Sequence, residues 1–377
     1  METKKTVLSF AAAGTVAGVA GLVLLASPAG AGEAPPELPA ISPDDLVESV
    51  LNTEIPALSG SVALENNLGL PLPGMPGSTD GAEIRVFTDG EGKHRVQLPD
   101  SGTETTVIDD GKTVWVWNSS ERSVTKVPHG ADGKAHEKPL ESRFADPATA
   151  ARELVDAMQK DSEVDVDGTA RVADRPVYQL VLTPKPTERT LLREVRVSVD
   201  SETRVPLQVE VLANGQAEPA VKAGFTEFAD GPQDASLFQF TPPEGATVTE
   251  QDPNEEFRGQ APKDLFGDLD LNTYGEGWDT VLTATIPNDM LTMPFDEARP
   301  GGDRGDRGDR GERGGFANGS DNPLELLGTL GKQVSGDFGT GYVISANVGT
   351  ALITEDGKVA IGAVPEQVVI EAAEQMK

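Results

Sequence analysis

Apolar and polar residues alternate along much of the chain between residues 60 and 118. Five segments have this two-residue period, namely 60–65, 83–88, 94–98, 105–109 and 113–118. Such a period is typical of strands that bury one face, and turn sequences such as Asp89-Gly90 and Asp109-Asp110-Gly111 separate several of the segments. The pattern therefore predicts an antiparallel meander.

Two segments with helical signals flank the meander. In the first, the sequence at 42–45, Ser-Pro-Asp-Asp, provides a cap, a proline at the first helical position and acids in the first turn. The second begins at Asp146-Pro147 and carries Leu154, Val155 and Met158 on its apolar side.

Strand signals return after the second helix, at 171–172, 177–183, 194–200 and 207–212. Four phenylalanines follow, at positions 225, 228, 238 and 240, before the sequence at 241–245, Thr-Pro-Pro-Glu-Gly, closes the unit. We therefore expect an α+β domain over residues 43–250.

A second and smaller unit is predicted at 278–377, beyond a polar, proline-bearing linker at 251–277. It begins with a strand at 278–286. It also contains a hairpin at 351–363, because Asp356-Gly357 lies there between two alternating apolar runs. A helix begun by Pro365 follows the hairpin.

Within this unit, residues 301–320 are expected to form a flexible loop. The segment repeats Gly-Asp-Arg without proline and is too short for a collagen helix. It contains the Arg-Gly-Asp triplet that some adhesion receptors read, at 304–306 and 307–309, but any Gly-Asp-Arg repeat produces this triplet. The triplet therefore gives no specific sign of adhesion.

The N-terminus has the features of an export signal. Lys4 and Lys5 precede an uncharged apolar run at 7–26, and Ala29 and Ala31 form a cleavage site of the A-x-A type. Cleavage after Ala31 is the favoured interpretation, although the run is also long enough to remain as an uncleaved membrane anchor. Either way the chain is expected outside the cytoplasmic membrane, secreted or tethered, with residues 32–42 as a spacer.

Composition narrows the classes of function. The chain of 377 residues has 31 Lys plus Arg against 62 Asp plus Glu, a formal net charge of −31. Such a charge repels phosphate backbones, so nucleic acid is not expected as a partner. Cysteine is absent, which excludes disulfides, thiolate nucleophiles and lipid attachment at a cysteine.

Motifs for catalysis and for cofactors are not found. His129 and His136, with nearby acids, could hold a metal, but a solvated loop is the favoured interpretation. The sequence from Asp268 to Asp279 begins like a calcium loop, but Thr273 stands where the turn requires glycine. We therefore expect no enzymatic activity, no resident metal and no cofactor.

Three stretches resemble the LolA and RseB group of exported lipoprotein carriers and sensors, of the type found in actinobacteria. The first is 110–117, which contains Trp115 and Trp117. The second is the predicted strand, turn and following strand at 197–209. The third is the segment Leu-Phe-Gln-Phe-Thr-Pro-Pro at 237–243. The likeness covers residues 43–250. It departs from the group at 69–81, a Gly- and Pro-rich stretch that could be a lid but is better interpreted as an insertion.

The resemblance implies a curved antiparallel half-barrel sheet, closed by helices around an apolar cavity for acyl chains. The residues expected to line this cavity are apolar residues of the predicted strands and helices: Trp115, Trp117, Leu51, Leu154, Met158, Leu180, Leu182, Val197 and Val199. Packing in an ordinary core is the alternative for each of them.

Two functions follow from the resemblance. The first is a carrier or binder of lipid or lipoprotein acyl chains. The second is an RseB-like envelope-stress sensor that regulates an anti-sigma factor through protein-protein contact, with a membrane-bound protein as its partner. The region 251–377 keeps the second function open as the alternative, because a pure carrier needs no second unit. A passive surface protein with neither ligand nor partner is a third possibility.

Overall fold

The computed structural model describes residues 34–67, 83–100, 103–129, 147–250, 272–286 and 331–376. The expected export signal, the stretch at 69–81 and the loop at 301–320 lie outside these residues. Residues Leu38–Lys377 form one compact unit. Among the helices of the described residues, none combines the length and the apolar character needed to cross a bilayer.

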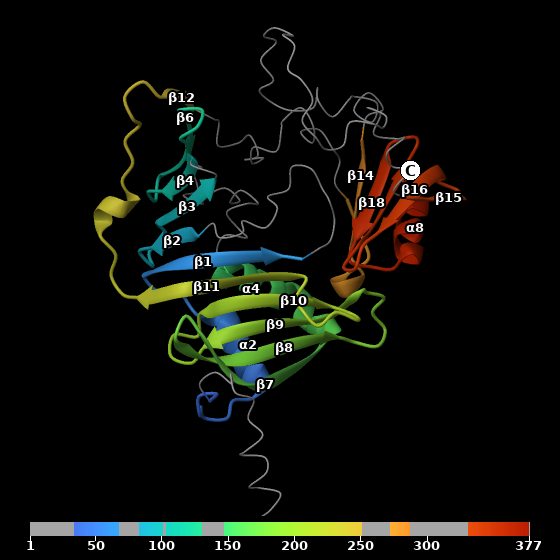
Figure 1. Cartoon of the computed structure of the whole chain (residues 1–377), viewed down its shortest axis with the longest axis horizontal. Helices are drawn as coiled ribbons and strands as arrows, with labels where there is room; N and C mark the ends of the chain where they lie inside the picture. The colour runs from blue at the N-terminus through green and yellow to red at the C-terminus, as the bar shows by residue number, and fades with distance from the viewer. Residues whose placement is uncertain are drawn as a thin grey trace, which may run out of the picture. The chain divides into compact units, whose positions relative to one another are not determined.

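Strands β1 to β12 form one open sheet whose edges are β12 and β7 (Figure 1). The strand order is β12-β6-β5-β4-β3-β2-β1-β11-β10-β9-β8-β7. The bounds are β1 Leu58–Asn66, β2 Ile84–Thr88, β3 His94–Asp100, β4 Thr103–Asp109, β5 Thr113–Asn118, β6 Ser123–Pro128, β7 Ser162–Val172, β8 Arg175–Pro184, β9 Leu192–Asp200, β10 Pro206–Ala213, β11 Val221–Asp230 and β12 Thr247–Glu250.

The predicted meander is confirmed. Strands β1 to β6 pair in sequence order and antiparallel, with turns at Asp89 and Asp110 whose carboxylates accept backbone N–H groups. Strands β6, β11 and β12 and most of β7 were not predicted from the sequence. Acids and Gly168 occupy much of β7, and such residues are depleted in strands. Pairing with β8 places β7 at the edge of the sheet, where its exposed positions tolerate them.

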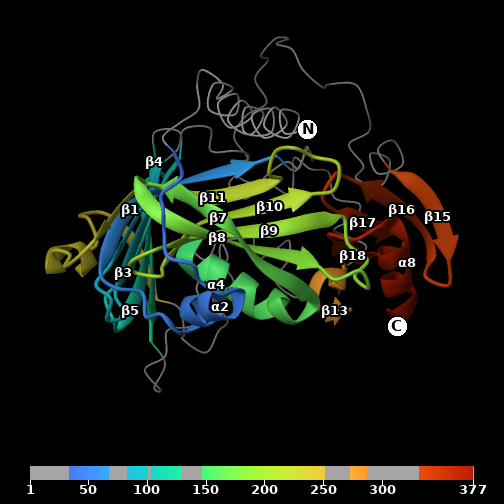
Figure 2. The ribbon, with the colours of Figure 1, turned by 90° about the horizontal axis from the view of Figure 1, so that it is seen from below.

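Two helices pack on one face of this sheet (Figure 2). Helix α2, Pro43–Asn52, begins where predicted, with the Ser42 hydroxyl accepting the Asp45 N–H. Helix α4, Pro147–Met158, ends in the 3-10 turn η1, Gln159–Asp161. Leu46 and Val50 of α2 and Val155 of α4 are fully buried against the sheet.

A second sheet has the strand order β13-β14-β18-β17-β16-β15. The bounds are β13 Asn272–Tyr274, β14 Val281–Thr285, β15 Lys332–Gly336, β16 Gly339–Ser345, β17 Thr350–Thr354 and β18 Lys358–Gly362. Helix α8, Glu366–Gln375, packs through Val368, Val369 and Ala372 against Val281, Leu352 and Ala360. The helix after Pro365 and the hairpin at Asp356-Gly357 are therefore confirmed.

One boundary in the second sheet differs from the prediction. Trp278 is not part of a strand but of a short 3-10 turn, η3, Gly277–Asp279, and β14 begins only at Val281. Gly275 and Gly277 have positive φ of 79° and 57°, which an extended strand does not allow. The chain thus turns here before it enters the sheet.

Candidate functional site

Seven of the nine residues expected to line a cavity lie in one place, under helices α2 and α4. Met158, Leu180, Leu182, Val197 and Val199 belong to a single buried cluster, and the partly buried Leu51 and Leu154 pack against it. The strands bring these side chains together because Leu180 lies opposite Val197 and their neighbours two residues away face the same side.

This cluster fills its own interior. Leu180, Leu182, Val197 and Val199 each have an exposed fraction of 0%, as do Leu46 and Val50 of the helix that covers them. Close packing of this kind leaves no room for a hydrocarbon chain unless side chains move. Within the described residues, these positions therefore act as core, which was the alternative to a cavity wall.

Trp115 and Trp117 lie on the other face of the sheet. The indole Nε1–H of Trp115 donates to Asp110 Oδ2 at 3.0 Å, and its ring centroid lies 5.7 Å from that of Phe240. Phe240 follows η2, Ala235–Phe238, whose Leu237 carbonyl accepts a hydrogen bond from Arg95 on the same face. The two tryptophans are thus not brought together with the other seven residues.

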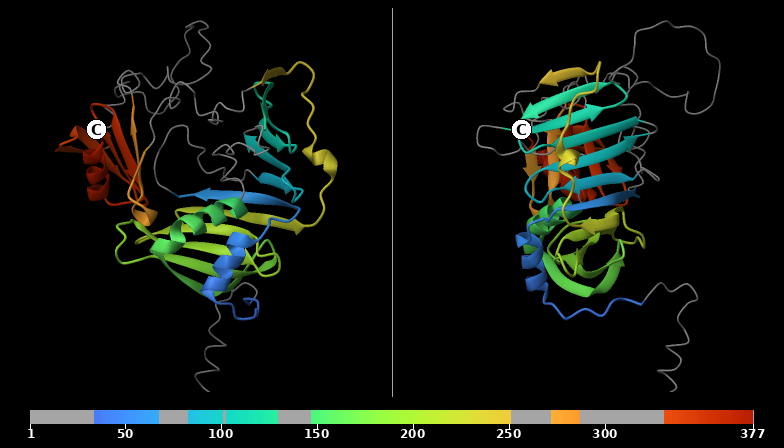
Figure 3. Two further views of the ribbon diagram at one scale, coloured as in Figure 1. Left: turned by 180° about the vertical axis from the view of Figure 1, so that it is seen from behind. Right: turned by 90° about the vertical axis from the view of Figure 1, so that its left-hand side faces the viewer.

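A different set of apolar residues extends the helix-side face. Val86, Val96, Val107 and Val116 are direct cross-strand partners on β2, β3, β4 and β5, and we call them the valine row. Val86 belongs to a buried cluster that also contains Ala148 of α4, which places the row on the side of the helices. The strands that carry it continue the sheet beyond α4 (Figure 3).

Burial decreases along the valine row. Val86 and Val96 have exposed fractions of 6% and 9%, whereas Val107 and Val116 are half-buried. The neighbours of the last two valines on this face include the uncharged Thr105 and Thr125. They also include Asp109, a buried carboxylate two residues along β4 from Val107, which lies 3.0 Å from His129. The valine row thus runs from the buried core at Val86 and Val96 to Val107 and Val116, which solvent partly reaches.

The sequence analysis did not select these valines, although the necessary signal was present. In the segment Val114-Trp115-Val116-Trp117 every second residue shares a face, so valines and tryptophans must lie on opposite sides. The face that the helices share is fixed instead by pairing between β1, β2 and β11, which brings Val62, Ile84 and Phe225 into one cluster.

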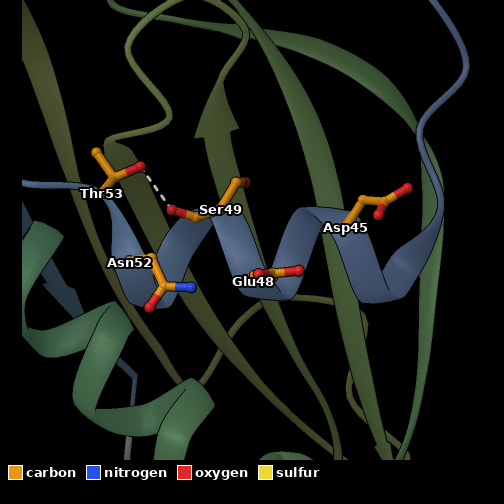
Figure 4. Close-up of a pocket in the computed structure, with 5 residues that line it drawn as sticks. All are labelled: Asp45, Glu48, Ser49, Asn52 and Thr53. Atoms are coloured by element: carbon orange, nitrogen blue, oxygen red, sulfur yellow. Dashed lines mark hydrogen bonds between the residues drawn. The ribbon is translucent and has the colours of Figure 1, made fainter.

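A surface depression of about 320 Å³ lies on the outward side of α2 (Figure 4). The residues that line it, Asp45, Glu48, Ser49, Asn52 and Thr53, all carry polar side chains. The Thr53 hydroxyl donates to the Ser49 carbonyl at 2.6 Å, so this lining group is already bonded to the backbone of the helix. Carboxylates in an open, solvated hollow do not suit an acyl chain.

The residues considered for metal binding have other partners. His129 Nε2 lies 3.0 Å from Asp109 Oδ1, while His136 is outside the described residues. Asp279 pairs with Arg189 at 3.1 Å. Among the residues that the structure describes, no group of three or more His, Cys, Asp or Glu is arranged to hold a metal ion.

Comparison with known families and with curated proteins gives no match. Solved structures do match the chain. The MucA/MucB complex of Pseudomonas aeruginosa does so at 16% identity and a TM-score of 0.38, covering 87% of this chain and 94% of that one. An uncharacterized conserved protein from Thermus thermophilus covers 55% of this chain and 97% of its own, at 14% identity and a TM-score of 0.31.

A LolA superfamily protein from Nitrosomonas europaea also matches, at 13% identity and a TM-score of 0.23, covering 53% of this chain and 99% of that one.

Proposed function

We propose that this chain is a non-enzymatic, extracytoplasmic binding protein that holds acyl chains of lipids or lipoproteins on the helix-side face of its large sheet. In this proposal the sheet is the curved wall of the site and helices α2 and α4 are its partial cover. The observation that carries the proposal is the valine row, where an apolar face extends past the helices and becomes half-buried at Val107 and Val116.

The size of the valine row suits a hydrocarbon chain. Its four residues span three strand spacings, about 14 Å in total at about 4.8 Å each. Burial of each methylene contributes about 0.8 kcal/mol, so contact along the row adds up without any directional interaction. The predicted export signal supports a location outside the cytoplasmic membrane, where such ligands are found.

The test places a charge on the row. We expect Val116→Asp to weaken binding of a fluorescent acyl probe at least tenfold, because loss of about two methylene contacts is worth more than about 1.4 kcal/mol. Val248→Asp is the matched control, since Val248 of β12 has an exposed fraction of 49% and lies outside the row. Probe titration and native mass spectrometry of the purified proteins measure both effects.

Two outcomes contradict the proposal. One is a wild-type protein that stays empty when it is offered lipids and lipopeptides. The other is equal binding by the two valine variants, which would show that the ligand does not use the row.

A sensor of the RseB kind is a second candidate, and the attachment of the second sheet to the first favours it. Arg189, in the segment between β8 and β9, forms ion pairs with Asp279 of η3 and Glu371 of α8. A carrier gains nothing from such a joint, whereas a sensor can present both sheets to a membrane-bound protein. If this function is correct, Val116→Asp leaves binding of that partner unchanged in a pull-down from membranes.

A further inference from the structure

The core of the large sheet contains one tryptophan that comes from the second sheet. Trp278 of η3 has an exposed fraction of 2% and belongs to the same buried cluster as Met158 and Leu182. Its Nε1–H donates to Ser162 Oγ at 2.9 Å, and that hydroxyl donates in turn to the Met158 carbonyl at 2.7 Å. We call this place the indole seat, formed by the end of α4, by η1 and by Ser162.

The glycine before Trp278 allows the indole to reach the seat. Gly277 has a positive φ of 57°, and a Cβ at this position would overlap the Asp161 carboxylate of η1. Only glycine allows the η3 backbone to approach η1 this closely. The η3 segment therefore lies against α4 and η1.

The indole seat lies next to solvent. Asp279, the residue after Trp278, binds Arg189, whose side chain has an exposed fraction of 45%. Arg189 also contacts Glu371 at 2.7 Å, and the Glu371 side chain is 44% exposed. The Arg189–Glu371 pair is exposed on both sides, so it stabilises the rim of the seat little and is screened by salt. Asp279 is less exposed and also accepts the Arg189 backbone N–H.

Other contacts hold the two sheets together without the indole. Leu191 N–H and the Thr190 hydroxyl both donate to the Ala363 carbonyl, each at 2.8 Å. Val348 of the second sheet's unit packs with the buried Ala213 and Ala220. The joint therefore has an anchor that is separate from Trp278, and the ring can leave its seat while the sheets stay attached.

The indole seat is also selective in its chemistry. Ser162 is a buried hydroxyl with an exposed fraction of 6%, and its oxygen faces the ring as an acceptor. A purely apolar filler would leave this acceptor without a donor, which carries a penalty in a buried site. We propose that the seat is a binding site for a fused aromatic ring bearing one N–H donor, occupied here by Trp278, so that a free ligand of this class and Trp278 exclude each other.

The experiment uses free indole as the probe and the full chain. Trp278→Gly empties the seat and is expected to bind one indole per chain by calorimetry, whereas the wild type, in which indole must displace Trp278, is expected to bind it more weakly. Naphthalene, which has the fused rings but no N–H, is expected to bind Trp278→Gly at least fivefold more weakly than indole. That preference should disappear when Ser162→Ala is added.

Trp115→Gly is the matched control, because Trp115 is half-buried on the opposite face and its loss creates no indole seat. Failure of Trp278→Gly to bind indole, or equal binding by Trp115→Gly, overturns the proposal. No lipid is present in these measurements, so their outcome is independent of acyl-chain binding.

A second measurement covers the case in which Trp278→Gly does not fold. The chain has three tryptophans, so Trp115→Phe with Trp117→Phe leaves the Trp278 indole N–H as the only one that a ¹⁵N spectrum reports. Unlabelled indole is expected to shift or weaken this resonance in a saturable way. A resonance unchanged at millimolar indole overturns the proposal.

Discussion

The buried carboxylate of Asp200, in the turn between β9 and β10, accepts hydrogen bonds from Arg175 and Thr203. Its replacement by asparagine tests how much these bonds contribute to the free energy of unfolding. Arg175 of β8 donates to it twice, at 3.0 Å from Nε to Oδ1 and at 2.9 Å from Nη2 to Oδ2. Thr203 donates both its N–H and its hydroxyl to Oδ2, at 2.7 and 2.8 Å. The Asp200 side chain has an exposed fraction of 0%.

We expect Asp200→Asn to lower the free energy of unfolding by about 3 kcal/mol at neutral pH. Breaking a buried ion pair costs about 3–5 kcal/mol, because one charge is left without compensation. The lower end applies here because Arg175 keeps two further acids, Glu202 at 3.1 Å and Asp230 at 3.5 Å. Urea unfolding followed by circular dichroism measures the change.

The pH dependence of the free energy of unfolding provides a second test of the Asp200 carboxylate. Burial alone would raise the pKa of Asp200, but hydrogen bonds from Arg175 and Thr203 outweigh it and hold the pKa below the ordinary value of 3.8. A lowered pKa means that this stabilisation is complete above pH 3.8 and is lost as the pH falls through the folded-state pKa. The difference between wild type and Asp200→Asn should therefore shrink below that pH.

Glu202→Gln is the matched control. Glu202 also contacts Arg175, but its side chain is 74% exposed, so the expected cost is at most about 1 kcal/mol. The reasoning is refuted if Asp200→Asn costs no more than this control, or if its cost stays constant as the pH is lowered.

Two further substitutions test local structure. Ser42→Ala removes the cap of α2 and is expected to cost about 1 kcal/mol in urea unfolding, whereas Ser49→Ala, inside the same helix, should cost clearly less; equal costs would contradict the role of the cap. Gly60→Ala should cost about 1–3 kcal/mol, because the new Cβ would lie 2.5 Å from the Glu227 carbonyl oxygen and 2.6 Å from the Phe225 ring. Ser59→Ala is its control, and a melting temperature of Gly60→Ala equal to that of the control would show that β1 has room to spare.

Local sequence was sufficient for the elements whose signals are local. The sequence at 42–45 predicts the start of α2, and Asp-Gly turns predict the β2–β3 and β4–β5 hairpins of the meander, because capping and turn formation involve only neighbouring residues. The stretch at 197–209, which carries part of the LolA resemblance, is the β9–β10 hairpin around Asp200. The α+β class and the sheet-rich architecture follow from these elements.

The candidate site depended on contacts between distant parts of the chain. Alternation shows that Val116 and Trp117 face opposite sides of β5, but it does not show which side the helices cover. The pairing of β1 with β11 decides which face the helices cover, and these two strands are too far apart in the sequence for a local pattern to show it. In the same way Trp278 reaches Ser162 across 116 residues.

The sequence by itself thus determined the start of α2, the Asp-Gly turns of the meander, and the alternation that places Val116 and Trp117 on opposite faces of β5. Only the tertiary structure decided which apolar residues are core, which form the valine row, and that a tryptophan of the second sheet occupies the core of the first. The physical reason is that periodicity is a property of neighbouring residues, whereas burial depends on which surfaces meet when the whole chain folds.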